Sequence, residues 1–230
     1  MAPRTKGWDR RQLLLGGAPG ATAAVVLAAC SPRSPKQISY APTFFSSGEW
    51  SFVNAAVRRL IPSEGEGPGA FEAGVPEFID RQMELPYGHG SYFYMSGPFL
   101  SDLDPTLGYQ LRFVPREIYR YGIASANQYC RERHGRNFSD LSATNQDTIL
   151  QSMEDGKCSF LPVSSSVFFG QLLGNTHEGY FSDPLYGGNR NMTAWTWIGF
   201  PGARADFTDW MDRAGAKYPY GPVSISGETA

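Results

Sequence analysis

The stretch PREIYRYGIASANQYCRERHG (residues 115–135) is the longest helical pattern in this sequence. Its last residue, Gly135, is a typical helix stop, because glycine readily adopts the left-handed conformation in which helices often end. Residues that would share one face recur at three- and four-residue spacing: Ile118, Tyr121, Gly122, Ser125 and Tyr129. The stretch therefore predicts a helix over residues 115–134 that packs one face against neighbouring elements.

Shorter helical patterns lie on both sides of this stretch. Serine caps helix N-termini through its hydroxyl group, and Ser46 or Ser47 and Ser142 stand where two of these patterns begin. The spacing of apolar residues predicts helices over residues 47–61, 75–85, 142–154 and 164–173, the last extending at most to 177. Weaker helical segments are predicted at 105–113 and 205–212.

The remaining segments lack helical or strand periodicity. Residues 62–74 are too rich in glycine to be anything but a loop, and residues 86–104 scatter aromatic rings among glycines. No strand-length run of β-branched residues, internal repeat or strand–helix alternation occurs. The sequence predicts an all-α, irregular helical domain over residues 44–230, with long, ordered, aromatic- and glycine-rich loops. A polar, proline-dotted linker is predicted at residues 31–43.

The first thirty residues resemble an export signal. Arg10 and Arg11 stand directly before a moderately apolar run, residues 13–29, which ends in small residues. Paired arginines favour the twin-arginine route, which carries folded proteins. Glycines and a proline interrupt the run, so a stable membrane span is not expected. Residues 1–30 are therefore predicted to be a twin-arginine signal peptide, which would place the mature protein in the periplasm.

The three cysteines raise two further questions. Cys30 follows Leu27-Ala28-Ala29, which resembles a lipoprotein processing site, so Cys30 is a lipidation candidate; the alternative is ordinary signal cleavage near the same alanines. Cys130 and Cys158 could form one disulfide in an oxidising periplasm, or remain two separately buried thiols. The sequence leaves both alternatives open, because it does not place the two Cα atoms within bridging range.

Charge and motifs narrow the chemistry. Without residues 1–29 the chain keeps 16 basic and 21 acidic residues, so its formal net charge is −5. An acidic chain does not suit nucleic acid as a partner. No dinucleotide-binding glycine motif follows a strand, no C-x-x-C-H haem motif occurs, and three scattered cysteines cannot form a four-cysteine metal site. We therefore expect no metal site and no cofactor in this chain.

The most unusual stretch is HEGYFSDPLYGGNRNMTAWTWIGFPG (residues 177–202), which collects aromatic rings, glycines and prolines. It could be a catalytic loop, a plug of the core, or a docking surface for another protein. His177 and Glu178 could act as a general base and its orienting carboxylate, but adjacent residues point to different sides. Some rings must be buried, yet tryptophan and tyrosine also dominate binding hot spots. Docking is favoured, no catalytic residue is predicted, and the predicted partner-binding residues are Tyr180, Phe181, Tyr186, Trp195, Trp197 and Phe200.

The same stretch carries a resemblance to a known family. The run from Glu178 to Asn189, followed by Trp195, Trp197 and residues 198–202, resembles the signature of the gluconate 2-dehydrogenase subunit 3 family. Other similar stretches lie upstream: Leu60-Ile61-Pro62, Gly67-Pro68-Gly69-Ala70, Glu72-Ala73-Gly74-Val75, Phe78-Ile79-Asp80 and residues 138–156. The resemblance covers roughly residues 44–202.

This resemblance implies the small, non-catalytic subunit of a periplasmic, membrane-associated sugar or sugar-acid dehydrogenase. In that family the catalytic partner is a flavoprotein of the glucose-methanol-choline type, which holds FAD, and a multihaem cytochrome c usually passes electrons to the membrane. The small subunit is thought to escort the folded flavoprotein through the twin-arginine translocase, a role that Arg10 and Arg11 would fit.

Two alternatives to this function remain open at the level of sequence. The chain could be a stand-alone exported enzyme that uses His177 and Glu178 on a small substrate, which a cofactor bound by the isolated chain would favour. It could also be a lipid-anchored periplasmic binding protein with no dehydrogenase partner, which a negative pull-down would favour.

Overall fold

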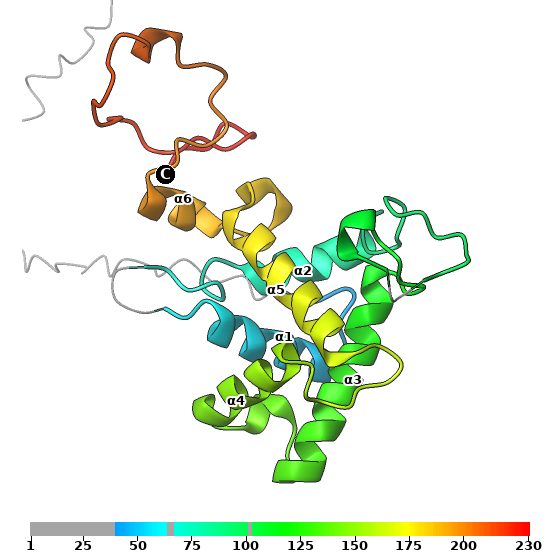
Figure 1. The fold of residues 1–230 in the computed structure, drawn as a ribbon. Helices are drawn as coiled ribbons and strands as arrows, with labels where there is room; N and C mark the ends of the chain where they lie inside the picture. The colour runs from blue at the N-terminus through cyan, green and yellow to red at the C-terminus, as the bar shows by residue number, and fades with distance from the viewer. Residues whose placement is uncertain (1–39, 64–66, 101–102) are drawn as a thin grey trace, which may run out of the picture. The chain divides into compact units, whose positions relative to one another are not determined.

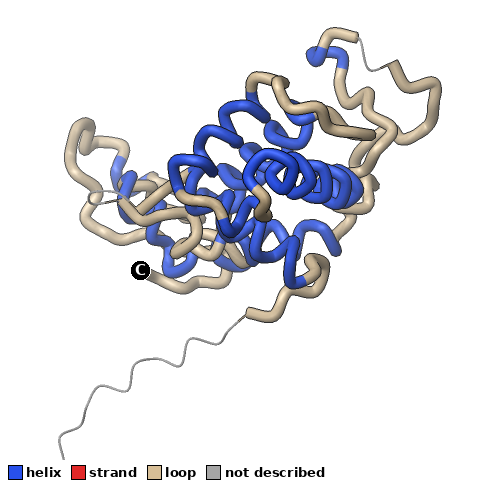
Figure 2. Tube along the Cα trace, turned by 90° about the horizontal axis from the view of Figure 1, so that it is seen from below, coloured by secondary structure: helices blue, strands red, loops and turns tan. Residues whose placement is uncertain are grey.

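The computed structural model describes residues 40–63, 67–100 and 103–230, and residues 40–230 form one compact unit. Figure 1 shows the α-helices of the described residues: α1 (Ser47–Leu60), α2 (Val75–Glu84), α3 (Pro115–His134), α4 (Ala143–Glu154), α5 (Ser165–Phe181) and α6 (Thr193–Ile198). Loops and short 3-10 turns join them, and no strand occurs in these residues (Figure 2). The predicted all-α fold is confirmed. No helix in this part of the chain combines the length and the apolar character needed to cross a membrane.

α5 is the central helix, and α1, α2, α3 and α4 all pack against it (Figure 1). Phe168, near its start, is completely buried, and its ring lies 5.8 Å from that of Phe52 on α1 and 6.0 Å from that of Tyr119 on α3. Gly122 allows α3 to come this close, because a Cβ there would lie 2.2 Å from the Phe168 ring. Three helices therefore interlock around one phenylalanine to form the centre of the core.

The N-terminal segment is tied to the bundle by one carboxylate. Asp80, on α2, is completely buried and accepts hydrogen bonds from the hydroxyl groups of Tyr40 and Thr43 at 2.7 and 3.0 Å. The backbone N–H groups of Thr43, Phe44 and Phe45 donate to the same carboxylate at 2.7, 3.1 and 2.9 Å. Residues 40–43 therefore belong to the folded unit, although the sequence placed them in the linker.

Local capping signals set several helix ends as expected. The backbone N–H of Ser46 donates to the Glu49 carboxylate at 2.8 Å before α1, and the Ser142 hydroxyl accepts the N–H of Asn145 at 3.4 Å before α4. The predictions for α1, α2 and α4 agree with the structure to within one residue at each end.

The buried face of α3 agrees only in part with the predicted one. Ile118 and Gly122 are buried, but Tyr121 is exposed, and Ser125 and Tyr129 are only half-buried. The other buried residues of α3 are Pro115, Tyr119, Ile123, Ala126 and Cys130. Gly122, the small residue that Phe168 requires, was predicted correctly, whereas the ring of Tyr121 was wrongly expected to be buried.

The prediction of a helix at residues 105–113 is also wrong. Only a single 3-10 turn, η2 (Pro105–Leu107), forms there, because Gly108 follows with φ of +93°, a left-handed conformation that ends the helical path. The turn predicted near residues 205–212 is present as η6 (Thr208–Trp210).

Candidate partner-binding surface

The stretch at residues 177–202 is largely helical, which corrects the expectation of a loop. α5 continues to Phe181, and three short helical segments follow: η4 (Pro184–Tyr186), η5 (Arg190–Met192) and α6. Asn189, just before η5, and Asn191 and Met192, within it, adopt left-handed backbone conformations. Such interruptions remove the regular spacing by which a helix is identified in a sequence.

Two buried aromatic side chains fix this stretch, one to the loop before α2 and one to the end of α5. Tyr180 is 3% exposed, and its hydroxyl donates a hydrogen bond to the Pro68 carbonyl at 2.6 Å. Trp195 is 6% exposed, and its indole N–H donates to the Phe181 carbonyl at 2.9 Å. Each ring thus has both a packed body and a satisfied polar group, which fixes the position of its neighbours.

Two buried polar side chains fix the turns between the helical segments. Asp183 caps η4 and also accepts the N–H of Ile225 at 2.7 Å, which ties the C-terminal segment to this turn. Asn189 donates to the Ser182 carbonyl at 3.0 Å and accepts the N–H of Ala194 at 2.9 Å. Because these buried groups are fully bonded to the backbone, the path of the chain is strongly specified.

The glycine-rich loop upstream of α2 supports the same stretch. The backbone N–H of Arg190 donates to the Ala73 carbonyl at 2.8 Å. The Trp197 ring packs over Gly67, where an added Cβ would lie 3.2 Å from the ring. Two separate parts of the sequence that carry the family resemblance therefore meet in space.

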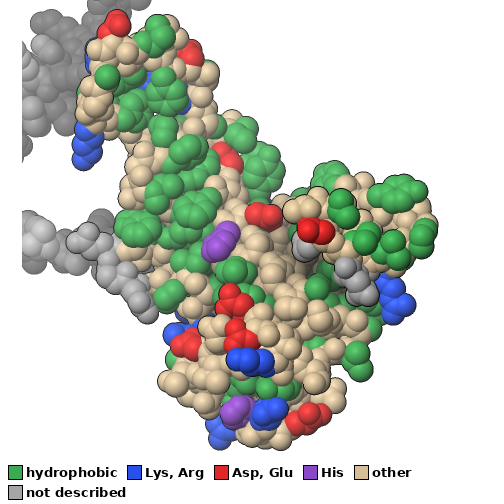
Figure 3. All heavy atoms as spheres, in the orientation of Figure 1, with side chains coloured by type: hydrophobic (Ala, Val, Ile, Leu, Met, Phe, Trp, Pro, Cys, Tyr) green, Lys and Arg blue, Asp and Glu red, His purple; other side chains and the backbone are tan. Residues whose placement is uncertain are grey.

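Six large apolar side chains of this stretch face solvent, each 43–58% exposed: Phe181, Leu185, Tyr186, Trp197, Ile198 and Phe200. We call this set the α5–α6 face. Figure 3 shows hydrophobic side chains gathered over α6 and the end of α5. Exposed apolar patches of this kind mark interaction sites, and aromatic residues are enriched in protein–protein interfaces.

The structure divides the six predicted partner-binding residues into two groups. Phe181, Tyr186, Trp197 and Phe200 belong to the α5–α6 face, whereas Tyr180 and Trp195 are buried and support it from below. Sequence analysis did not select Leu185 and Ile198, or the bonded side chains of Asp183 and Asn189. In the sequence, the only sign that Asp183 and Asn189 fix turns is that Asp183 precedes a proline and Asn189 follows two glycines.

The alternative catalytic pair is not assembled. His177 and Glu178 are both exposed on α5, and the Glu178 carboxylate accepts a hydrogen bond from the Asn175 amide at 2.8 Å. No hydrogen bond joins His177 to Glu178 among the described residues. Within the same residues, no cluster of three or more His, Cys, Asp or Glu side chains could hold a metal ion.

Cys130 and Cys158 are separate, buried thiols in the structure, not a disulfide. Burial raises the pKa of Cys130 to about 11 and also raises the pKa of Cys158. Both thiols are therefore protonated near neutral pH and are poor nucleophiles. The predicted export residues Arg10 and Arg11 and the lipidation candidate Cys30 lie outside the described residues.

Comparison with known proteins places the chain in a family. The family model of gluconate 2-dehydrogenase subunit 3 matches residues 47–202, more than half of the sequence, from the start of α1 to the end of the stretch described above. No curated protein and no solved structure matches the chain. Subunit 3 is an accessory subunit, and membership implies a catalytic dehydrogenase subunit as its partner. The chain belongs to the gluconate 2-dehydrogenase subunit 3 family.

Proposed function

We propose that this chain is the small, non-catalytic subunit of a periplasmic sugar or sugar-acid dehydrogenase, and that its α5–α6 face binds the folded catalytic subunit. The observation that carries the proposal is the combination of six exposed apolar side chains with the buried, hydrogen-bonded rings of Tyr180 and Trp195 beneath them. Family membership supports the kind of partner, and the α5–α6 face is a surface suited to receive it.

Rigidity favours tight binding, because each flexible side chain immobilised in an interface costs about 0.5–1.5 kcal/mol. On the α5–α6 face, the Phe200 ring already packs edge-to-face against buried Trp195, with centroids 5.1 Å apart. The Phe181 ring packs in the same way against buried Tyr180 at 4.9 Å. These rings would lose little freedom when covered, so most of the apolar area that they bury would stabilise the complex.

The proposal also gives the N-terminus a role. The catalytic subunit would be a glucose-methanol-choline type flavoprotein that folds around FAD before export, and the twin-arginine route is the one that carries folded proteins. Arg10 and Arg11 would then direct the export of both subunits, provided that the two subunits bind each other before export. A multihaem cytochrome c would receive the electrons at the membrane, and lipidation of Cys30 would add a membrane anchor.

The proposal is tested by co-expressing the C-terminally tagged chain with the catalytic subunit and purifying it from the envelope fraction. We expect a second, larger chain on the gel and flavin absorbance in the visible spectrum. With Arg10→Lys and Arg11→Lys combined, the catalytic subunit should stay in the cytoplasm with its flavin bound. A single colourless chain from the unaltered protein would contradict the proposed partner, and export with the paired lysines would contradict the escort role.

A further inference from the structure

The chain leaves the bundle soon after Phe200, the last residue of the α5–α6 face, and then returns to it. Residues 203–221, here called the C-terminal arm, extend beyond α6 (Figure 1), and none of them, all of which the structure describes, is buried. Within the arm the only helical element is the 3-10 turn η6. Loops of more than about 15 residues with so little regular structure are uncommon and usually functional. The family model ends at residue 202, so family membership assigns the arm no role.

The two ends of the arm are held together at its base. Gly202 and Val223 pair as an isolated β-bridge, and the backbone N–H of Ala203 donates to the Val223 carbonyl at 2.7 Å. Gly202 permits this close approach, because an added Cβ would lie 2.2 Å from the Val223 carbonyl oxygen. The hydrogen bond from the Ile225 N–H to Asp183 ties the same base to η4. The arm therefore begins and ends beside the α5–α6 face.

One arginine holds the interior of the arm together. The Arg204 guanidinium donates to the Asp206 carbonyl at 2.7 Å, to the Asp209 carboxylate at 2.5 Å and to the Tyr218 hydroxyl. It also lies 5.1 and 5.3 Å from the centroids of the Phe207 and Tyr218 rings, within the range of cation–π attraction. Because a single planar group contacts both strands of the loop, the arm has a preformed shape.

The rings of the arm form a connected cluster that faces solvent. The Tyr218 ring packs edge-to-face against those of Phe207, Trp210 and Tyr220, with centroids 5.8, 5.4 and 5.5 Å apart. Phe207, Met211 and Tyr220 are 42%, 73% and 64% exposed. Figure 3 shows hydrophobic side chains on the arm, on the same side of the molecule as those over α6. Tryptophan and tyrosine on a preformed support are typical of binding hot spots.

The area of the α5–α6 face indicates that it is only part of an interface. Its six side chains are each 43–58% exposed, which amounts to on the order of 600 Å² of apolar area, since a large side chain covers about 150–250 Å² in full. Permanent complexes bury about 2,000–5,000 Å² in total, half of it on each partner. The exposed apolar side chains of the arm add on the order of 400 Å². Together the two surfaces reach the size of a small permanent interface.

The charge of the arm selects the kind of partner. The arm contains three basic and three acidic residues, so its formal net charge is zero. A neutral surface gains little from an anionic membrane, which attracts clusters of lysine and arginine. An aromatic, neutral and preformed surface instead suits a folded protein.

We infer that the C-terminal arm is a second contact for the folded catalytic subunit, and that it slows dissociation of the complex. The inference rests on the proposed function and adds a separate surface to it. A partner that contacts both the arm and the α5–α6 face must release both before it leaves, and while one contact holds, the other re-forms readily.

The inference is tested by surface plasmon resonance of the purified full chain on the immobilised, flavin-containing catalytic subunit. Met211→Ala combined with Tyr220→Ala should raise the Kd about tenfold, mainly through faster dissociation. The urea midpoint should stay unchanged, because both side chains are exposed.

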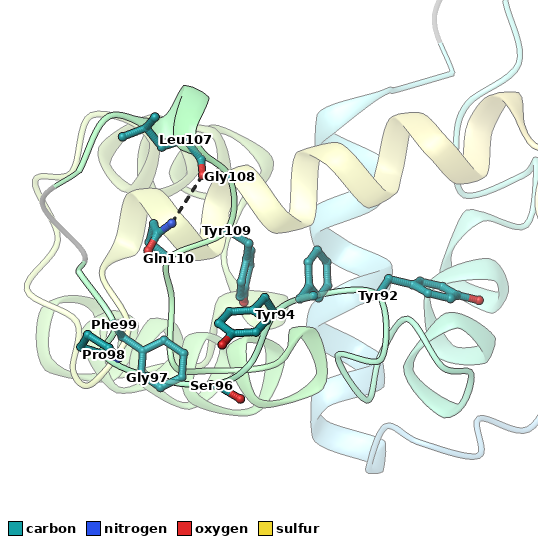
Figure 4. Close-up of a pocket in the computed structure, with 11 residues that line it drawn as sticks. Tyr92, Tyr94, Ser96, Gly97, Pro98, Phe99, Leu107, Gly108, Tyr109 and Gln110 are labelled. Atoms are coloured by element: carbon teal, nitrogen blue, oxygen red, sulfur yellow. Dashed lines mark hydrogen bonds between the residues drawn. The ribbon is translucent and has the colours of Figure 1, made fainter.

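A second variant separates the order of the arm from its apolar area. Arg204→Ala leaves every ring in place but removes the side chain that joins them, so the arm must be ordered when it binds. The Kd should rise about threefold to tenfold. The matched control combines Tyr94→Ala with Leu107→Ala. These two residues are 81% and 63% exposed and line a cavity in the segment between α2 and α3 (Figure 4), and their loss should leave the Kd within about twofold.

The outcomes distinguish this inference from the proposed function. If the unaltered chain binds the catalytic subunit and dissociates from it no more slowly than both arm variants, the inference is overturned and the proposed function stands. An equal loss of affinity in the control variant would also overturn the inference, because the effect would not belong to the arm. If the unaltered chain does not bind the catalytic subunit at all, both fail. Sedimentation of the chain alone covers the remaining occupant: a dimer abolished by Met211→Ala with Tyr220→Ala would assign the arm to a second copy and overturn the inference.

Discussion

Phe168, near the start of α5, is completely buried between the rings of Phe52 and Tyr119, whereas Phe181, the last residue of the same helix, is 45% exposed. The two ends of this helix carry the same kind of side chain in opposite surroundings. At the first end, aromatic rings hold the bundle together. At the second end, Tyr180 and Trp195 are buried and their neighbours are presented to solvent. The difference suggests that stability and partner binding are carried by separate residues, which mutations can distinguish.

The largest expected effect is on stability at the buried end. Phe168→Ala should lower the free energy of unfolding by about 3–5 kcal/mol, because it leaves a cavity where three helices meet. Phe181→Ala is the matched control, and it should lower the same free energy by less than about 1 kcal/mol. Urea unfolding followed by circular dichroism measures both, and similar losses in the two variants would contradict the separation.

The two tryptophans of α6 provide the sharper comparison. Trp195→Ala should lower the free energy of unfolding by about 3 kcal/mol, because it removes a buried ring and its hydrogen bond to Phe181. Trp197→Ala should change it by no more than about 0.5 kcal/mol. The loss of this exposed ring should instead weaken binding of the catalytic subunit by about 2 kcal/mol, which is roughly thirtyfold in Kd. Equal stability of the two variants would show that Trp195 does not support the face.

These tryptophans also show where sequence analysis reaches its limit. Both stand in one short aromatic stretch, two residues apart, and nothing local distinguishes them. Their difference comes from their surroundings in the fold, since Trp195 is buried and donates to the Phe181 carbonyl, while Trp197 lies over Gly67 and stays 58% exposed. On α3, Tyr121 was wrongly placed in the buried face, whereas Gly122, against which Phe168 packs from 46 residues downstream, was placed correctly.

The features that could be predicted are those with local causes. α1 and α4 were located correctly because Ser46 and Ser142 cap them and apolar residues repeat along them. The family resemblance could also be recognised in the sequence, because it depends on short runs of glycine and aromatic residues.

A third aromatic pair extends the comparison to the N-terminal segment. Phe44 and Phe45 are buried because their backbone N–H groups are held by Asp80. Asp80→Asn should lower the free energy of unfolding by about 2 kcal/mol, because an amide cannot accept all five hydrogen bonds. Hydrogen exchange at the amides of residues 43–45 should become faster, while exchange in α5 stays slow. Unchanged protection at these three amides would show that the carboxylate does not anchor the segment.

The smallest predicted effect concerns the ion pair between Glu49 on α1 and Arg120 on α3. Burial tends to raise the pKa of Glu49, but hydrogen bonds from Arg120 and Ser46 outweigh it and hold the pKa below its ordinary value of 4.5. A pKa that is lower in the folded state stabilises the fold above about pH 4.5 and ceases to do so as the pH falls through the folded value. Glu49→Gln should therefore cost about 1 kcal/mol at pH 7, a modest figure because the pair is partly solvent-screened.

The pH profile of unfolding checks this prediction. The stability difference between the unaltered protein and Glu49→Gln should be constant from pH 7 to pH 5.5 and should shrink below pH 4.5. A difference that persists at pH 3 would assign the effect to packing and not to charge.

The most direct test of the central claim is the affinity of the catalytic subunit for a variant in which Trp197 and Phe200 are both replaced by alanine. If the α5–α6 face is the binding surface, this variant should unfold at the same urea concentration as the unaltered protein and yet fail to co-purify with the flavin-containing subunit. If the variant retains the flavin-containing subunit at full yield, the partner binds elsewhere on the chain, and the α5–α6 face is not the docking surface.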